Sequence, residues 1–525
     1  MFRRIAVAVA AGVLLLSGCG AGAGGSDDKS AAKSKGSAAQ PDSGGGAVAP
    51  GLGGGDAEGA QKADPEARDF APARDMVSTF ALDVDTASYQ YARRTIQDGR
   101  LPQPDTVRTE EFVNSFRQNY PEPEGDGFSV TTDGARAPGE QGWSLMRVGL
   151  ATRSATNAYG SDRRAPAALT FVIDISGSMA EPGRLDLVRE ALRLTTDELR
   201  PDDSVAIVTF SDEADVLLPM TRLSEGNKNE VRAAIEKLRP TDSTNLAAGV
   251  ELGYEQAVET RREGATNRVV LLSDALANTG ETDADAILDR IGDARRDHGI
   301  TLFGVGVGSD YGDELMERLT NHGDGHTSYV SDLDQARRVF VDQLPRNIDL
   351  RARDAKAQVR FDESTVEQFK LIGYENRAVA DEDFRNDRVD GGEIGPGHTV
   401  TALYAVRLKE GASGHVATAT VRWLDPKNRS PHEESRSIEA PALGGELWGG
   451  ADERFQVAVL AAYFADALRG GTGTAERGAG ATGPLPGAPT IQELSRRAAA
   501  LSARLEDRQV TELGETIDRA VALVS

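Results

Sequence analysis

One stretch in the middle of the chain has residue types and a spacing that suit a divalent cation. Asp174, Ser176 and Ser178 occupy alternate positions directly after an apolar run at residues 169–173. Such a run is typical of a central parallel strand, and open α/β sheets bind ligands beyond the carboxyl ends of their strands. One carboxylate and two hydroxyls are hard oxygen donors of the kind that Mg²⁺ prefers. Ser and Asp are also common in capped turns, so the pattern alone leaves a metal-free turn as the alternative.

Two further oxygen donors are expected at the same edge of the predicted sheet. Thr244 precedes an apolar helical pattern that starts at Leu246, and Asp274 directly follows the apolar run at residues 269–273. The carboxyl ends of neighbouring parallel strands share one edge of a sheet, so these side chains should lie near the first three. The sequence therefore predicts one site with five oxygen-bearing side chains.

This set resembles the metal ion-dependent adhesion site of the von Willebrand factor type A (VWA) domain, over roughly residues 166–347. The resemblance implies the ligand set Asp174, Ser176, Ser178, Thr244 and Asp274. The hydroxyls would bind the metal directly, and the carboxylates directly or through water. Mg²⁺ is the expected ion, with Mn²⁺ or Ca²⁺ as alternatives, and one coordination position would stay open for a carboxylate of a partner protein. Ala275 stands where such domains usually have Gly.

The N-terminus resembles a bacterial lipoprotein signal. Arg3 and Arg4 precede an apolar run at residues 5–16, which is short for a membrane span, and a lipobox-like Leu-Ser-Gly-Cys follows. The resemblance implies cleavage before Cys19 and a lipid such as palmitate on its sulfur. The protein would then be anchored to the cell membrane on its extracytoplasmic face.

Composition limits the classes of partner. The formal net charge of −24 argues against nucleic-acid binding, which needs a basic surface. Residues 20–74 are mostly Gly, Ala, Ser, Asp and Lys, which cannot form a core, so a disordered tether is expected there. The rest of the chain has the apolar content of an ordinary folded protein.

Strand and helix patterns alternate through residues 166–347, which predicts a doubly wound, Rossmann-like α/β domain. Alternating β patterns before and after it are expected to pair as a β-sandwich into which this domain is inserted. The expected organisation is a signal peptide at 1–18, a tether at 19–75, a small α/β unit at 76–125, sandwich strands at 126–165, the VWA domain at 166–347, a β-rich domain at 348–445 and C-terminal helices at 446–525 with a Gly-rich hinge at 470–489. The flanking regions resemble those of bacterial proteins labelled as calcium-activated chloride channel homologues.

Two other groups of polar residues are interpreted as structural. Asp83, Asp85 and Ser88 could form half of a metal site, but no complementary Thr or Asp pair accompanies them in the sequence. They lie between a strand pattern and a helix pattern, so strand-end and helix-cap roles are expected. His322 and His326 belong to a Gly-containing loop pattern and are interpreted as turn residues, since the sequence shows no third zinc ligand.

The motifs favour a binding module over an enzyme. The six histidines form no HExxH pattern, and no Gly-x-Ser-x-Gly elbow is present. We therefore expect a membrane-anchored adhesion or scaffold-like protein that captures an acidic side chain of another protein through the metal. The alternatives are an accessory component of an envelope assembly or enzyme complex, and a structural envelope protein whose metal site stays unoccupied.

Overall fold

The computed structural model describes residues 76–139, 142–154, 164–224, 226–241, 243–274, 283–308, 313–322, 325–389, 391–470 and 485–524. All of them belong to one compact unit, Ala63–Ser525. The expected signal peptide, the tether and Cys19 lie outside the described residues, as do Ala275 and most of the expected hinge at 470–489.

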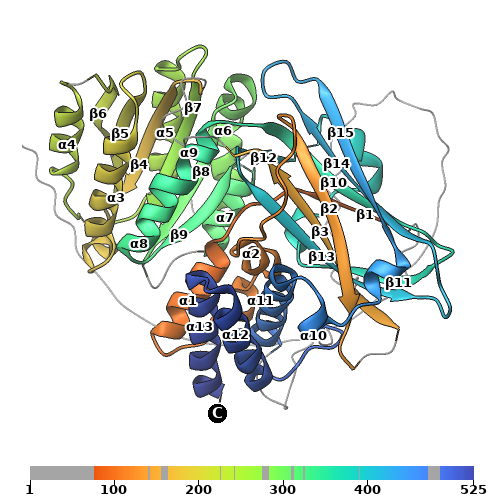
Figure 1. Cartoon of the computed structure of the whole chain (residues 1–525). Helices are drawn as coiled ribbons and strands as arrows, with labels where there is room; N and C mark the ends of the chain where they lie inside the picture. The colour runs from red at the N-terminus through yellow and green to blue at the C-terminus, as the bar shows by residue number, and fades with distance from the viewer. Residues whose placement is uncertain are drawn as a thin grey trace, which may run out of the picture. The chain divides into compact units, whose positions relative to one another are not determined.

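A six-stranded sheet with the order β6-β5-β4-β7-β8-β9 forms the centre of the VWA-like region (Figure 1). Its strands are β4 Ala167–Asp174, β5 Ser204–Phe210, β6 Ala214–Arg222, β7 Thr266–Ser273, β8 Thr301–Val307 and β9 His326–Val330. All neighbouring pairs are parallel except β5 with β6. Residues 211–213, which join these two strands, are too few for a crossover helix, so the edge strand runs antiparallel.

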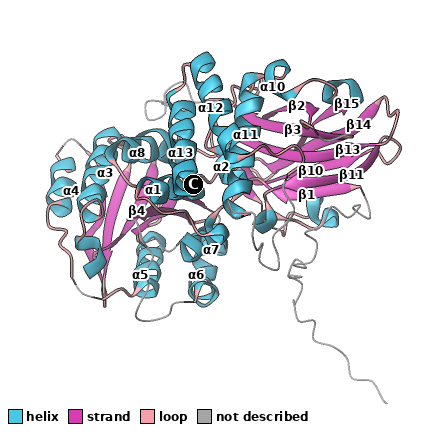
Figure 2. Ribbon diagram, turned by 90° about the horizontal axis from the view of Figure 1, so that it is seen from below, coloured by secondary structure: helices cyan, strands magenta, loops and turns pink. Residues whose placement is uncertain are grey.

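Helices cover both faces of this sheet (Figure 2). Leu169, Phe171 and Ile173 of β4 pack in the core on one face, and Val172 packs in the core on the other. Both faces of the strand are therefore buried, which explains its continuous apolar run. The helices are α3 Leu185–Glu198, α4 Lys228–Ile235, α5 Leu246–Glu259, α6 Ala284–His298, α7 Asp313–His322, α8 Leu333–Arg337 and α9 Leu344–Ile348. The doubly wound fold predicted from the sequence is confirmed.

Strands before and after the VWA region pair with one another, which confirms the inserted arrangement. One sheet has the order β1-β10-β14-β15 with β12 beside β10, and the other has the order β11-β13-β3-β2. Buried residues of both sheets share one apolar core. The strands are β1 Val77–Ala81, β2 Phe128–Arg136, β3 Trp143–Thr152, β10 Ala352–Phe361, β11 Val366–Ile372, β12 Gly392–Ile394, β13 Thr399–Leu408, β14 His415–Leu424 and β15 Pro431–Glu439.

A layer of helices packs on the outer face of the β11-β13-β3-β2 sheet. It combines helices from both ends of the described chain in one apolar core, which also includes Leu145 and Leu403 of the sheet. The helices are α1 Ala87–Gln97, α2 Thr109–Asn114, α10 Leu447–Gly450, α11 Glu453–Arg469, α12 Ile491–Leu505 and α13 Arg508–Val524. Residues 76–125, expected to form a unit of their own, are thus divided: β1 pairs with β10, and α1 and α2 join the helical layer.

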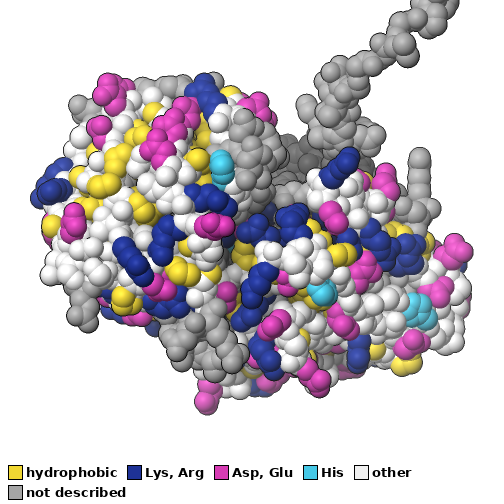
Figure 3. Space-filling view, turned by 90° about the horizontal axis from the view of Figure 1, so that it is seen from above, with side chains coloured by type: hydrophobic (Ala, Val, Ile, Leu, Met, Phe, Trp, Pro, Cys, Tyr) yellow, Lys and Arg dark blue, Asp and Glu magenta, His cyan; other side chains and the backbone are white. Residues whose placement is uncertain are grey.

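The distribution of surface charge and the character of the helices both bear on function. Acidic and basic side chains are interspersed on the face drawn in Figure 3. Within the described residues, no helix combines the length and the apolar character needed to cross a membrane.

Candidate metal centre

Strand β4 carries Asp174 to the carboxyl-terminal edge of the six-stranded sheet. The residue is fully buried, and both of its carboxylate oxygens accept hydrogen bonds. Oδ1 accepts from the backbone N–H of Ser176 at 2.8 Å, and Oδ2 accepts from the hydroxyl of Ser273, at the end of the neighbouring β7, at 2.6 Å. Groups on two segments therefore fix the orientation of this carboxylate.

The two serine hydroxyls predicted as ligands lie together next to Asp174. Ser176 Oγ is 3.1 Å from Ser178 Oγ, and the loop between the serines opens a short 3-10 turn, Gly177–Ala180. Oxygen ligands in neighbouring positions of an octahedral Mg²⁺ shell lie about 2.9 Å apart, given Mg–O bonds of about 2.0–2.1 Å. The hydroxyl pair therefore fits such a shell. Ser178 is half-buried and Gly177 is exposed, so the pair reaches the protein surface.

Thr244 lies in the loop that precedes α5, at the same edge of the sheet. Backbone hydrogen bonds attach this loop to the ends of two strands: Thr241 N–H donates to Ile175 O, and Asn245 N–H donates to Ser211 O, both at 2.6 Å. The Asn245 side chain then caps α5 by accepting from the N–H of Ala248. Thr244 itself is 2% exposed. The structure thus places this residue beside the segment that carries Asp174.

Asp274, which directly follows β7, is also fully buried, and one of its oxygens contacts an arginine that the sequence analysis missed. Arg184 Nη1 donates to Asp274 Oδ2 at 2.8 Å, and Arg184 Nη2 donates to Glu181 Oε2 at 2.7 Å. Gly308 makes room for the guanidinium, since a Cβ there would lie 2.6 Å from Arg184 Nε. No spacing in the sequence relates residue 184 to residue 274.

The electrostatics of this edge favour a cation. Burial raises the pKa of Asp174 to about 6, the nearby charge of Asp274 adds to the rise, and the hydrogen bonds from Ser176 and Ser273 reduce it. The carboxylates of Asp174 and Asp274, at the same edge of the sheet, are both buried away from water. Arg184 supplies one compensating positive charge.

The donor set fits a hard divalent ion. Asp174, Ser176 and Ser178 lie in contact, Thr244 lies in the adjacent loop, and Asp274 is near enough to Asp174 to affect its titration. Every donor of the set is an oxygen, as Mg²⁺ and Ca²⁺ prefer. These five residues could hold the ion, which would act as a Lewis acid toward an oxygen ligand.

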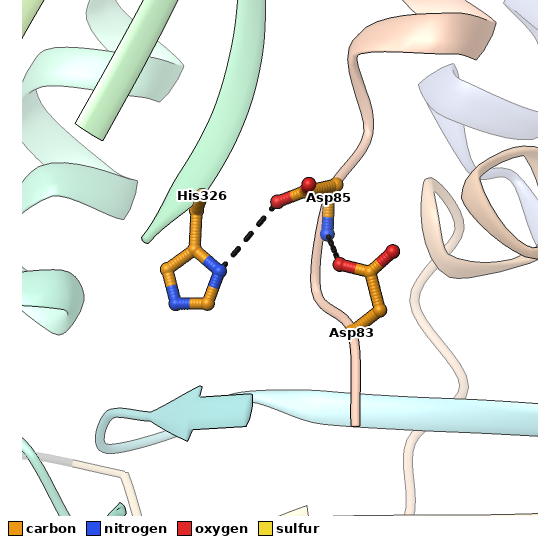
Figure 4. Close-up of side chains that lie close together, drawn as sticks. All are labelled: Asp83, Asp85 and His326. Carbon is orange, nitrogen blue, oxygen red and sulfur yellow. Dashed lines mark hydrogen bonds and ion pairs between the residues drawn. The ribbon is translucent and has the colours of Figure 1, made fainter. Parts of the chain in front are cut away.

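A second group of candidate ligands joins two residues from the half-site considered in the sequence with a histidine that was interpreted as a turn residue (Figure 4). Asp83 and Asp85, in the connection between β1 and α1, lie beside His326, the first residue of β9, and the ligand atoms of the three are within 4.8 Å of one another. The turn interpretation of His326 is wrong, because this residue is buried and belongs to strand β9. Asp83 and Asp85 follow the end of β1, as expected, but neither aspartate caps α1, whose N-cap is Thr86. More than two hundred residues separate the partners, so no local motif reports their contact.

Family models match most of the described chain. A von Willebrand factor type A domain model matches residues 168–343, a model described as "Uncharacterized protein YfbK, C-terminal" matches residues 348–440, and a model described as "von Willebrand factor" matches residues 62–147. VWA domains are typically protein-interaction modules, often with a divalent-metal site.

Individual relatives agree with these matches. The chain is 34% identical over 427 residues to the uncharacterized protein YfbK of Escherichia coli, covering 76% of this chain and 72% of the relative. It is 27% identical over 196 residues to the uncharacterized protein sll0103 of Synechocystis, covering 37% of this chain and 44% of that protein.

A solved von Willebrand factor type A structure from Catenulispora acidiphila has 15% identity and a TM-score of 0.40, covering 62% of this chain and 75% of the other.

The VWA model matches the centre of the chain, and the other two models match the regions before and after it. Together with the 34% identity to the Escherichia coli protein YfbK, these matches show that the chain belongs to the family of that protein.

Proposed function

We propose that the chain is a membrane-anchored, extracytoplasmic protein-binding module that captures an acidic side chain of a partner through a divalent cation. The cation would bind at the Asp174 edge, the site of Asp174, Ser176, Ser178, Thr244 and Asp274. The observation that carries this proposal is the hydroxyl pair of Ser176 and Ser178, 3.1 Å apart beside the oriented carboxylate of Asp174 and open to the surface at Ser178. An ion held there would face solvent on the side of Gly177. A carboxylate of another protein is a suitable ligand for that position.

The contacts of these hydroxyls support a cation-binding role. Ser176 and Ser178 hydrogen-bond each other, and both the N–H and the side chain of Ser176 hydrogen-bond Asp174. Oxygen donors grouped around one position suit a hard divalent ion. We therefore propose an adhesion or scaffold-like protein rather than an enzyme.

Metal binding is tested by calorimetry on the full chain after EDTA treatment. We expect Mg²⁺, with Mn²⁺ or Ca²⁺ as alternatives, to bind one site that Ser176→Ala weakens. Ser204→Ala is the matched control, because Ser204 is also a buried serine but lies at the opposite end of the sheet, where it accepts a hydrogen bond from Arg262. Equal Mg²⁺ affinity for both variants and the unmodified protein would contradict the assignment.

Capture of a partner is tested with an array of peptides that carry single Asp or Glu residues and their Asn or Gln counterparts. The proposal expects retention of acidic peptides in Mg²⁺, loss of retention in EDTA, and loss on Asp174→Asn. Binding that is insensitive to EDTA, or equal for the amide peptides, would mean that the partner is not recognised through the metal.

The proposed anchor rests on the N-terminal sequence, in which Arg3, Arg4 and an apolar run precede Cys19. A lipid on the sulfur of this cysteine would hold the protein at the outer face of the cell membrane. Cells grown with a fatty-acid probe should label the protein, and Cys19→Ala should abolish the label. A labelled alanine variant would remove this part of the proposal.

A further inference from the structure

We propose that Asp83, Asp85 and His326 form a second metal site, which takes a divalent transition-metal ion such as Zn²⁺ at the junction of the N-terminal segment and strand β9. The site lies apart from the Asp174 edge and does not depend on it. Its three residues are 2% to 4% exposed. Figure 4 shows the His326 ring and the Asp85 carboxylate facing each other from different segments, with the Asp83 carboxylate against the backbone N–H of Asp85.

The hydrogen bonding of His326 leaves one ring nitrogen without a donor or acceptor partner. Nε2 lies 2.7 Å from the backbone oxygen of Glu393, and a carbonyl oxygen only accepts, so Nε2 carries the proton. In neutral imidazole, Nδ1 then bears a lone pair. This buried Nδ1 has no hydrogen-bond partner among the described residues, and it lies 3.5 Å from Asp85 Oδ1. Nδ1 and the Asp85 oxygen are thus both electron-pair donors in a buried position, and a cation between them, either a proton on Nδ1 or a metal ion, would bridge the two.

The separation of these atoms fits two ligands of one tetrahedral ion. Zn²⁺ binds imidazole nitrogen and carboxylate oxygen at about 2.0–2.2 Å, which places tetrahedral ligands about 3.4 Å apart. The distance from His326 Nδ1 to Asp85 Oδ1 is 3.5 Å, and Asp83 supplies the third ligand atom within 4.8 Å. Three protein ligands leave the fourth position for water.

Backbone groups hold both carboxylates in place. Asp83 Oδ1 accepts from the N–H of Asp85 at 2.9 Å, and Asp85 Oδ1 accepts from the N–H of Thr327 at 2.9 Å. Arg377 also donates to both residues, at 3.1 Å and 3.2 Å. The aspartates are therefore preorganised before any ion binds, as a metal site requires.

Other buried acidic and basic side chains surround the three ligands. The acidic residues are Glu110, Glu111 and Glu317, and the basic residues are Arg108 and Arg377. Arg377 is the cation that pairs with both Asp83 and Asp85. Two neighbouring buried carboxylates are costly to charge, and a divalent cation between them would add to the compensation that Arg377 supplies.

This site and the Asp174 edge have different donor atoms and should therefore prefer different metal ions. The Asp174 edge offers oxygen alone and suits Mg²⁺, whereas an imidazole nitrogen with two carboxylates suits Zn²⁺. An ion here would cross-link the connection before α1 to the start of β9. The expected role is to fasten the N-terminal segment to the VWA sheet.

Zn²⁺ titration of the full chain carrying Asp174→Ala tests the inference, because this background removes the proposed Mg²⁺ site. We expect one equivalent of Zn²⁺ to bind and His326→Gln to weaken it at least tenfold. His398→Gln is the matched control: His398 is also buried, its ring centre is 6.2 Å from that of His326, and its Nδ1 accepts from Gly395 instead. This control should bind Zn²⁺ like its background.

Two results would overturn the inference: no stoichiometric Zn²⁺ binding in the Asp174→Ala background, or an equal loss in His326→Gln and His398→Gln. Should His326→Gln fail to fold, the Asp174→Ala protein still provides a test. Zn²⁺ should raise its Tm and give its Co²⁺ form the absorption spectrum of a tetrahedral nitrogen and oxygen site. An octahedral spectrum or an unchanged Tm would refute the proposed site, while leaving the Asp174 edge unaffected.

Discussion

The ion pair between Arg184 and Asp274 leads to a prediction about the balance between folding and metal binding. The guanidinium nitrogen is 2.8 Å from the carboxylate oxygen, and both residues are almost fully buried. Unit charges about 4 Å apart interact by about 4 kcal/mol at an effective dielectric constant of 20. A cation that binds Asp274 must compete with this pair, so removal of the guanidinium should favour the cation.

We expect Arg184→Met to lower the free energy of unfolding by about 3–5 kcal/mol in EDTA, because the buried carboxylate loses its partner. Mg²⁺ should restore more stability to this variant than to the unmodified protein. Recovery of about 1.4 kcal/mol corresponds to a tenfold gain in affinity. Urea unfolding with and without Mg²⁺ measures both quantities, since an ion that binds only the folded state adds stability in proportion to the logarithm of its concentration over Kd.

Arg193→Met is the control for this experiment. Arg193 lies on α3, near Arg184 in the sequence, but its side chain is 37% exposed and pairs with Glu190 and Glu236 at the surface. Its loss should cost less than about 1 kcal/mol and leave the Mg²⁺ effect unchanged. If Arg184→Met were destabilised but gained no more from Mg²⁺ than Arg193→Met, Asp274 would not belong to the metal site.

Three further predictions concern the ligands, a buried acid and the domain arrangement. Asp174→Asn should reduce Mg²⁺ affinity more than Ser178→Ala, because the carboxylate supplies charge and the hydroxyl does not; equal losses in calorimetry would contradict this order. Burial raises the pKa of Glu110 from 4.5 to about 7, so the folded protein retains a proton that the unfolded chain has already released. The stability that protonated Glu110 provides is fully present below pH 4.5 and is lost as the pH rises through 7. Stability should fall by up to about 1.4 kcal/mol per pH unit in this window, and Glu110→Gln should flatten the slope in urea titrations. A fragment of residues 76–347 should aggregate, since β1 and β3 lose their partners β10 and β13, whereas residues 166–347 should stay monomeric in size-exclusion chromatography.

The sequence predicted the central fold well because local patterns report it. A fully apolar β4 and amphipathic helices with regular spacing are properties of short segments, and the alternation of the two specifies a doubly wound sheet. The adhesion-site residues followed from the same logic, since Asp174, Ser178 and Asp274 each occupy the end of a strand or the loop after it. Their role as ligands remains a prediction.

Features that depend on distant partners could not be predicted. Asp85 accepts a hydrogen bond from Thr327, 242 residues later in the chain, and Arg184 meets Asp274 across 90 residues. No periodic pattern in the sequence predicts either contact, because each contact depends on how whole helices and strands pack together. The division of residues 76–125 between the sandwich and the helical layer has the same origin, since β1 pairs with β10 and α1 packs on β9 and α13, all from the second half of the chain, as well as on α2.

Because the VWA domain is inserted in the sandwich, strands that pair with each other are synthesised far apart in time. Strand β3 is synthesised before the VWA region, and its neighbour β13 is synthesised after that region. Thr152 at the end of β3 hydrogen-bonds Gly395, which lies shortly before β13 and 243 residues later in the chain. At about 5–20 residues per second, the ribosome needs roughly 12 to 50 s to make this interval. An unpaired β3 edge would therefore persist while the inserted domain has time to fold. We expect the nascent chain to need a holding chaperone during this interval, and early termination after residue 347 to be more harmful than loss of the C-terminal helices.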